Sequence, residues 1–290
     1  MNQPSPQNQL SDAELPVLDA VLLPSLVQPE FFEGKTVVVV DVLRATTTIT
    51  SAIHAGCRYV LPQGAIETAK DTFTKLESNE ETAGVSMLGG ERRGKIVPGF
   101  HGGNSPVEYT SEVAADKILI LATTNGTVAM DHCALGKRVL IGSMVNLTAV
   151  AEQVVADSDL VVLCSGTDRL VTSEDVIFAG AFLQRVQELR WQAGLPIGKL
   201  TDPAMIATNH WQTVRRQVEA GTPLADFLKN ARGGINLVKI GHSRDIEFAA
   251  NIDSLPIVSE LNTKLGRFAA SRLHRDSRIL VIKTYCRSSF

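Results

Sequence analysis

The chain has 290 residues, of which 44% are hydrophobic, enough for one large domain or two modest ones with a packed core. A net charge of −3 excludes the global basic field that attracts nucleic acid or an anionic membrane surface. No apolar run approaches the roughly 20 residues of a membrane helix, and the polar start of the chain lacks a secretion signal. We therefore expect a cytoplasmic globular protein that binds neither nucleic acid nor membranes, with a disordered tail over residues 1–15.

Short apolar runs alternate with amphipathic segments over the first two thirds of the chain. Strands are predicted at 20–24, 36–42, 58–62, 85–91, 117–124, 138–144 and 160–166, and helices near 47–56, 65–77, 105–115, 126–135, 146–157 and 173–192. This alternation predicts an α/β fold, in which a largely parallel or mixed sheet has helices on both faces, giving three layers.

After residue 192 the pattern changes. Helices are predicted within 205–221 and 223–231, and a short capped helix within 243–253. Residues 257–268 form either a last strand or a connection. The basic C-terminal end contains the strand-like run ILVIKTY, residues 279–285, whose pairing with another subunit's edge would give a homodimer.

Three of the predicted strands end alike, in VVVVDVLRATTT, ILILATTNGT and LVVLCSGTD. Each passes from an apolar run into Thr, Ser, Asn or Gly and then into a helix. In open parallel sheets, ligands bind beyond the carboxyl ends of the strands, where helix N-termini offer free amides. Asp41 ends the first of these strands, so a cation and an anion are expected to bind there together.

A second region rich in candidate functional residues is the loop 88–110, LGGERRGKIVPGFHGGNSPVEYT. Its six glycines allow the backbone to approach a ligand closely. Glu91 ends an apolar strand, as Asp41 does, and is a candidate oxygen ligand or base. Arg92 is a candidate anion donor, and Asn104 and Ser105 are candidate caps of the helix that follows.

Carboxylates at strand ends suit Mg²⁺, and arginine, hydroxyls and free amides suit a phosphate, so the residues point to phosphoryl chemistry. Neither GxxxxGK[ST] nor a GxGxxG after a strand is present. The DVLRA segment departs from the DxDxT motif of haloacid-dehalogenase-type phosphatases at Leu43. In CSGTDR the arginine comes one position too early for the CxxxxxR loop of cysteine-based phosphatases, which disfavours Cys164 as a nucleophile.

Five blocks, DVLRATTTITSAI, LGGERRGKIVPGFHGGNSPVEYT, TTNGT, GSMVNLTAVA and CSGTDRLVTSEDVIFAGA, together resemble the motifs of the 2-phosphosulfolactate phosphatase (ComB) family, in that order. The resemblance implies Mg²⁺-dependent hydrolysis of 2-phospho-3-sulfolactate to 3-sulfolactate and phosphate, a step of coenzyme M biosynthesis in methanogens. It also implies a ComB-like catalytic unit over residues 16–268, with two lobes divided near residue 150, and a C-terminal extension over 269–290.

The resemblance implies roles for individual residues. Asp41 and Glu91 would hold Mg²⁺, and Arg44 and Asp175 would join them as catalytic groups. Further positions expected near the phosphate or substrate are Thr46, Thr47, Thr48, Arg92, Asn104, Ser105, Thr123, Thr124, Asn125, Gly126, Thr127, Ser165, Gly166 and Thr167. Glu174 forms a second acidic pair with Asp175 at a helix start, where complementing the helix dipole is an equal alternative.

Several alternatives stay open at this point. The nucleophile is either a metal-activated water, with Asp41, Glu91 or Asp175 as base, or else Cys164 or Asp41 through a phosphoenzyme. Candidate donors to the substrate's sulfonate and carboxylate are Arg92, His101 and Arg169. The rival functions are a phosphatase of a different small anionic ester and a non-catalytic protein that binds an anionic metabolite.

Overall fold

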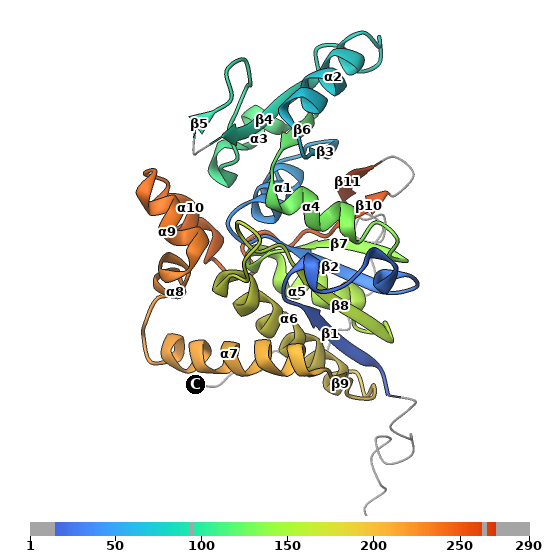
Figure 1. Ribbon diagram of the computed structural model, residues 1–290, viewed down its shortest axis with the longest axis vertical. Coiled ribbons are helices and arrows are strands. Elements are labelled where there is room, and N and C mark those ends of the chain that lie inside the picture. The colour runs from blue at the N-terminus through green and yellow to red at the C-terminus, as the bar shows by residue number, and fades with distance from the viewer. Residues whose placement is uncertain (1–14, 93–94, 263–265, 271–290) are drawn as a thin grey trace, which may run out of the picture.

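A mixed sheet of eleven strands organises the part of the chain that the computed structural model describes, residues 15–92, 95–262 and 266–270 (Figure 1). The strand order is β5-β4-β6-β3-β11-β10-β7-β2-β8-β1-β9. The strands are β1 (Val17–Val21), β2 (Thr36–Val40), β3 (Tyr59–Gln63), β4 (Ser86–Arg92), β5 (Lys95–Ile96), β6 (Ile118–Ala122), β7 (Arg138–Gly142), β8 (Asp159–Cys164), β9 (Lys199–Leu200), β10 (Ser259–Asn262) and β11 (Arg267–Ala270).

The helices alternate with the strands up to β9 and then follow one another. They are α1 (Ala45–His54), α2 (Ile66–Glu77), α3 (Ser111–Ala114), α4 (Asn125–His132), α5 (Leu147–Val154), α6 (Ser173–Gln192), α7 (Asp202–Glu219), α8 (Leu224–Asn230), α9 (Arg232–Lys239) and α10 (Ser243–Ala249). Short 3₁₀ helices are η2 (Pro24–Leu26), η3 (Pro29–Phe32), η4 (Pro106–Glu108) and η5 (Met144–Asn146).

Two parallel parts of the sheet are joined by an antiparallel hairpin. Strands β7, β2, β8, β1 and β9 run parallel to one another, as do β4, β6 and β3. The hairpin β10–β11 lies between the two parts and is antiparallel to both β7 and β3. The predicted α/β fold with a mixed sheet is therefore confirmed, and the segment predicted at 257–268 contains β10 and the start of β11, which pair with each other at the centre of the sheet.

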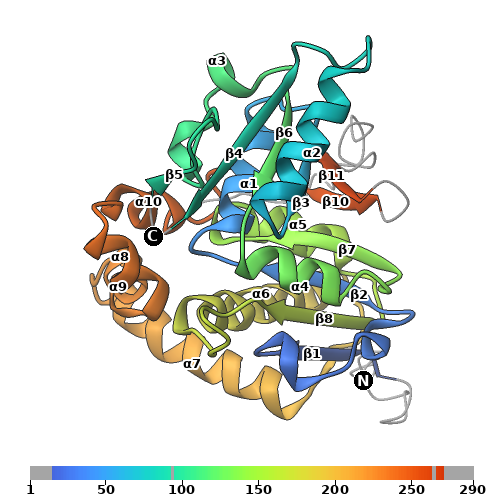
Figure 2. The ribbon, with the colours of Figure 1, turned by 45° about the horizontal axis from the view of Figure 1, so that its top comes forward.

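Helices cover both faces of the sheet (Figure 2). Strand β2 shows why, because its valines alternate between two cores. Val38 and Val40 pack in the cluster built with α5, α6 and α7. Val37 and Val39 pack on the other side, in the cluster that includes residues of α1 and α4. A strand buried on both faces needs an unbroken apolar run, and the sequence of β2 has one.

Three of the differences from the sequence prediction have a clear local cause. The first strand ends at Val21 rather than continuing to residue 24, and Pro24 starts η2; proline has no N–H to donate to a strand. The helix expected over 105–115 is split into η4 and α3. Helix α9 was not predicted, because Gly233 and Gly234 lie in its first turn and glycine has low helix propensity.

The structure does not test every predicted feature of the chain. The tail over residues 1–14 and the run ILVIKTY fall outside the described residues. Strands from 16–150 and from 151–268 pair within one sheet, as β1 does with β8, and a lobe boundary near residue 150 stays a prediction. Among the described helices, none is both long and apolar enough to cross a membrane.

Candidate active site

Asp41 directly follows β2, and the turn that holds it is fixed by the threonines of α1. The Oγ1 of Thr46 accepts a hydrogen bond from the Asp41 amide at 2.9 Å and donates one to the Asp41 carbonyl at 2.8 Å. The hydroxyl of Thr47 donates to the Val42 carbonyl at 2.8 Å. Both threonines are fully buried. Their hydroxyls, predicted near the phosphate, are thus occupied in shaping the turn between β2 and α1.

The start of α4 packs directly against Asp41. The Asp41 carboxylate, 7% exposed, accepts hydrogen bonds from the Ala45 amide, at 3.2 Å, and from the Gly126 amide. A Cβ on Gly126 would lie 2.6 Å from the Ala45 Cβ and 3.1 Å from Asp41 Oδ2. Only glycine allows this approach, so the structure brings the TTNGT block and Asp41 together although β6 and β2 are not neighbours in the sheet.

Asp175, at the start of α6, accepts hydrogen bonds from the two loops that follow β2 and β8. Its Oδ1 accepts a hydrogen bond from the Val42 amide at 2.9 Å. Its Oδ2 accepts one from the Gly166 amide at 2.9 Å and one from the Thr172 hydroxyl at 3.3 Å. Both oxygens thus hold the loops that follow β2 and β8 in place, and the role of Asp175 as a base stays a prediction.

Glu174 is the neighbouring acid, and it is only 1% exposed. Its Oε1 accepts a hydrogen bond from the Gly233 amide of α9 at 3.0 Å. Its Oε2 is buried and has no hydrogen-bond partner among the described residues. The sequence favoured Asp175 over Glu174 as the catalytic acid, and the contact that distinguishes them comes from α9, which was not predicted.

The three acids influence one another electrostatically. Burial, followed by the charge of Asp175, raises the pKa of Asp41, while the Ala45 amide, Arg44 and the Gly126 amide act in the opposite direction. Burial and then Asp175 raise the pKa of Glu174, and burial raises that of Asp175. A cation held by Asp41 would relieve the repulsion among these desolvated carboxyl groups.

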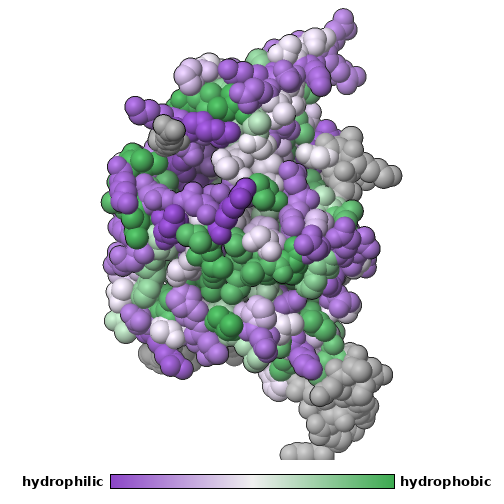
Figure 3. Space-filling view, viewed as in Figure 1, coloured by the Kyte–Doolittle hydropathy of each residue, from purple (hydrophilic) through white to green (hydrophobic). Residues whose placement is uncertain are grey.

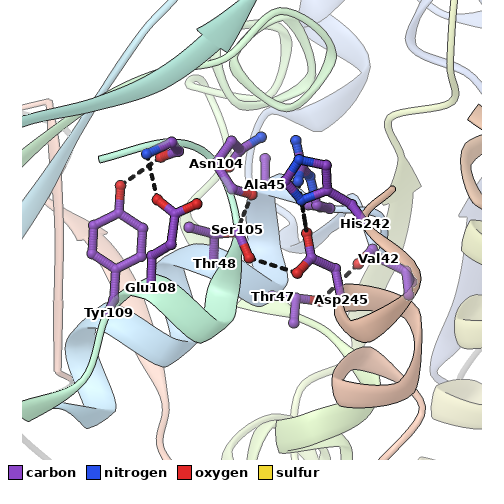
Figure 4. A network of polar contacts seen from close by, with 12 residues as sticks. Val42, Ala45, Thr47, Thr48, Asn104, Ser105, Glu108, Tyr109, His242 and Asp245 are labelled. Carbon is purple, nitrogen blue, oxygen red and sulfur yellow. Dashed lines mark hydrogen bonds and ion pairs between the residues drawn. The ribbon is translucent and has the colours of Figure 1, made fainter. Parts of the chain in front are cut away.

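The glycine-rich loop 102–105 is clamped beside α1 (Figure 4). The Gly103 amide donates to the Glu108 carboxylate at 2.5 Å, and the Tyr109 hydroxyl donates to the Gly103 carbonyl at 2.6 Å. The Thr48 hydroxyl donates to the Asn104 carbonyl at 3.0 Å. These contacts leave the Asn104 side chain 8% exposed, with its Oδ1 unpartnered within the described residues.

Four buried oxygen atoms of these segments have no hydrogen-bond partner in the described part of the chain. They are Asn104 Oδ1, Thr127 Oγ1, Ser165 Oγ and Glu174 Oε2. A buried polar atom without a partner is costly and calls for a bound group to satisfy it. Asn104, Thr127 and Ser165 were all predicted site positions.

Arg44 completes this region. It is the residue before α1, is 6% exposed, and its Nη1 lies 2.6 Å from Asp245 Oδ2 of α10. Asp245 also accepts a hydrogen bond from the Ser105 hydroxyl at 2.5 Å, so this hydroxyl is already engaged. Figure 3 shows a recess with hydrophilic walls between β5 and α10, located by comparison with Figure 1. Asp245 was missed from sequence, where it looked like an ordinary acid in the first turn of a short helix.

Glu91 lies at the end of β4, and five strands separate β4 from β2 in the sheet order. The charged groups that act on the pKa of Asp41 are Asp175 and Arg44. The pairing of Asp41 with Glu91 around a metal therefore stays a prediction. Arg92 donates from Nη1 to the Glu91 carbonyl at 3.0 Å.

The other predicted positions are less enclosed. Thr124 is exposed, and Asn125 and Thr167 are half-buried at the starts of α4 and of the loop after β8. His101 is exposed, and its Nδ1 accepts a hydrogen bond from the Leu88 amide at 2.9 Å, which leaves only Nε2 for a ligand. Arg169 is exposed in a tight turn at φ 60°.

Cys164 is unsuited to act as a nucleophile. Its side chain is fully buried in the apolar cluster beneath α5, α6 and α7. Burial, with the charges of Asp175 and Glu174, raises the thiol pKa well above its ordinary value. Since the thiolate is the reactive form, the burial of Cys164 argues against the phosphoenzyme alternative through this residue.

Comparison with known proteins finds relatives that align with most of this chain and with most of their own length. Proteins named "Probable 2-phosphosulfolactate phosphatase" are 32% identical in Clostridium botulinum (strain Eklund 17B / Type B) and 35% identical in Carboxydothermus hydrogenoformans. The first alignment covers 83% of this chain and 95% of the relative, and the second 84% and 94%. A third, from Symbiobacterium thermophilum, is 34% identical, covering 79% of this chain and 92% of the relative. The family described as 2-phosphosulpholactate phosphatase matches residues 21–264, and the chain belongs to this family.

Proposed function

We propose that this protein is a phosphoric monoester hydrolase that converts 2-phospho-3-sulfolactate to 3-sulfolactate and phosphate in an Mg²⁺-dependent reaction. The names of its relatives support this substrate. The observation that carries the proposal is the position of Asp41, buried at a strand end between the Gly126 amide and Arg44. A carboxylate for a cation thus lies beside a helix start and a guanidinium, both of which suit an anion.

The residues present fit Mg²⁺. This ion prefers oxygen ligands, and it commonly uses one or two carboxylates while keeping several waters. The unpartnered atoms of the site are all oxygens, and the described residues contain no cluster of three or more His, Cys, Asp or Glu able to hold a metal. Asp41 would hold the ion, with Glu91 as the second predicted carboxylate. When bound, Mg²⁺ would neutralise charge on a phosphate oxygen.

The protein's own groups would do the remaining work by positioning and charge neutralisation, which phosphoryl transfer chiefly requires. Arg44 would bind phosphate oxygens through guanidinium N–H groups. The first amides of α4, where the helix dipole is positive, would stabilise charge on the group in transfer. Water is the proposed nucleophile, because Cys164 is buried in the core and the Asp41 carboxylate is assigned to the metal ion.

The test is phosphate release from matched esters, with Mg²⁺ or with EDTA. 2-Phospholactate lacks the sulfonate but keeps the rest of the substrate. The proposal predicts a kcat/KM at least about tenfold higher for 2-phospho-3-sulfolactate, since a site built for a charged group discriminates strongly against its absence. EDTA should remove the activity.

Two variants separate catalysis from binding. Asp41→Asn should lose hydrolysis, whereas Glu247→Gln, which changes an exposed acid on α10, should keep it. Clear preference for an unrelated ester would retain the phosphatase and overturn the substrate. Hydrolysis at the normal rate by Asp41→Asn would overturn the proposed mechanism, and binding without hydrolysis by the unmodified protein would favour a metabolite-binding role.

A further inference from the structure

Asp245 is a buried charge that no predicted function uses. It lies on α10, near the end of the described chain, and is 1% exposed. Figure 4 shows its carboxylate at the meeting point of three segments. Oδ2 lies 2.6 Å from Arg44 Nη1, and Oδ1 accepts a hydrogen bond from the Ser105 hydroxyl at 2.5 Å. On its outer side, His242 Nδ1 lies 3.4 Å from Oδ2.

Both inner partners belong to the walls of the candidate active site. Arg44 follows Asp41 by three residues, and Ser105 directly follows Asn104, whose side-chain Oδ1 is unpartnered. They are separated from Asp245 by 201 and 140 residues in the chain. One carboxylate on α10 therefore fixes two strand-end loops relative to each other.

Stability alone does not account for this arrangement. Removing a carboxylate and a guanidinium from water is so costly that apolar residues of similar volume often serve a core equally well. The contact uses one of the five N–H groups of the Arg44 guanidinium. The carboxylate thus restrains the guanidinium from one side and leaves further donors for a ligand.

We propose that Asp245 is a positioning residue for the phosphate site: it orients the Arg44 guanidinium toward the ester's phosphate and fixes the Asn104–Ser105 loop beside it. The inference rests on the proposed function and deepens it. The consequence is that α10, which contains none of the predicted site residues, completes the site. Asp245 acts through Arg44 and Ser105 and does not itself touch the substrate.

The affinity for inorganic phosphate distinguishes a positioning role of Asp245 from the effect of its negative charge. Asp245→Asn removes a negative charge near an anion site, and this change by itself would strengthen the binding of inorganic phosphate. Loss of positioning has the opposite effect, since the guanidinium is no longer restrained. We expect calorimetry with inorganic phosphate in the presence of Mg²⁺ to show binding weakened about tenfold or more.

The matched control is Glu247→Gln, the same chemical change two residues along α10. Glu247 is exposed and lies 3.6 Å from Lys229, away from the site residues. This variant should bind phosphate as the unmodified protein does. Circular dichroism of each variant checks that it is folded. Phosphate binding by folded Asp245→Asn that is unchanged or tighter overturns the proposal.

Asp245→Glu serves if Asp245→Asn does not fold. It keeps the charge but moves the carboxylate by one methylene, so a positioning role predicts weaker phosphate binding than in the unmodified protein, and unchanged binding overturns it. The two proposals can fail separately. Intact phosphate binding without hydrolysis of 2-phospho-3-sulfolactate would overturn the function and leave the role of Asp245 testable, whereas no phosphate binding by the unmodified protein would overturn both.

Discussion

Replacing Asp41 with Asn is expected to stabilise the metal-free protein at alkaline pH while removing hydrolysis. Burial, and then the charge of Asp175, raises the pKa of Asp41 from 3.8 to about 7. Folding therefore favours the protonated form of this carboxyl. The stability linked to such a group is fully present below the unfolded pKa and is lost as the pH rises through the folded pKa. At pH 8 the folded protein bears the whole cost of the buried charge, and an amide bears none.

The structure indicates the size of the effect. A rise of about three pKa units corresponds to about 4 kcal/mol. An amide keeps only one of the two acceptor oxygens that serve the Ala45 and Gly126 amides, and the lost hydrogen bond costs about 1–2 kcal/mol. The free energy of unfolding at pH 8 should thus rise by about 2–3 kcal/mol. At pH 5 Asp41 is already protonated in the folded protein, so most of this gain should vanish.

Urea unfolding in EDTA, followed by circular dichroism at pH 5 and pH 8, measures both values. Asp159→Asn is the matched control, because Asp159 is an exposed acid at the start of β8; it should change the stability by less than about 0.5 kcal/mol at either pH. The reasoning is refuted if Asp41→Asn is less stable than the unmodified protein at pH 8, or if the difference between the two proteins is the same at both pH values.

Three further predictions follow from the same site. Adding Mg²⁺ at pH 8 should raise the thermal midpoint of the unmodified protein but not that of Asp41→Asn, and equal shifts in a thermal scan would argue against Asp41 as a ligand. Cys164→Ala should lower the free energy of unfolding by about 1–2 kcal/mol yet keep kcat within about threefold; a complete loss of phosphate release in the folded variant would restore the thiol as nucleophile. Gly126→Ala should destabilise the protein by about 1–3 kcal/mol and lower kcat, because the added Cβ meets the Ala45 Cβ at 2.6 Å. Val128→Ala, at an exposed position of the same helix, should do neither in urea unfolding or kinetics.

The local pattern of apolar residues predicted most of the helices and strands up to α6. The pattern of apolar residues predicted α6 at residues 173–192, where the structure has it. It also predicted the buried valine strand that ends at Asp41. The prediction of element ends and of short helices was weakest beside proline and glycine. Examples are Pro24, which follows the end of β1, and the glycine pair in α9.

The candidate site was only partly predictable. Its blocks could be recognised, since strand ends and helix starts leave polar residues in the sequence. What each side chain does could not be inferred from its type. Thr46 and Thr47 look like phosphate donors, but their hydroxyls bond the backbone of the turn. Asp175 looks like a base, but its oxygens bond the Val42 and Gly166 amides.

The sequence by itself determined the α/β class and the strand that presents Asp41, because both depend on the short-range periodicity of apolar residues. The tertiary structure decided which distant groups meet: Asp41 with Asp175 and Gly126, and Arg44 with Asp245. Such encounters depend on the order of strands in the sheet and on the path of the last helices. Both are set by the packing of whole elements against one another, and no local stretch of sequence records that packing.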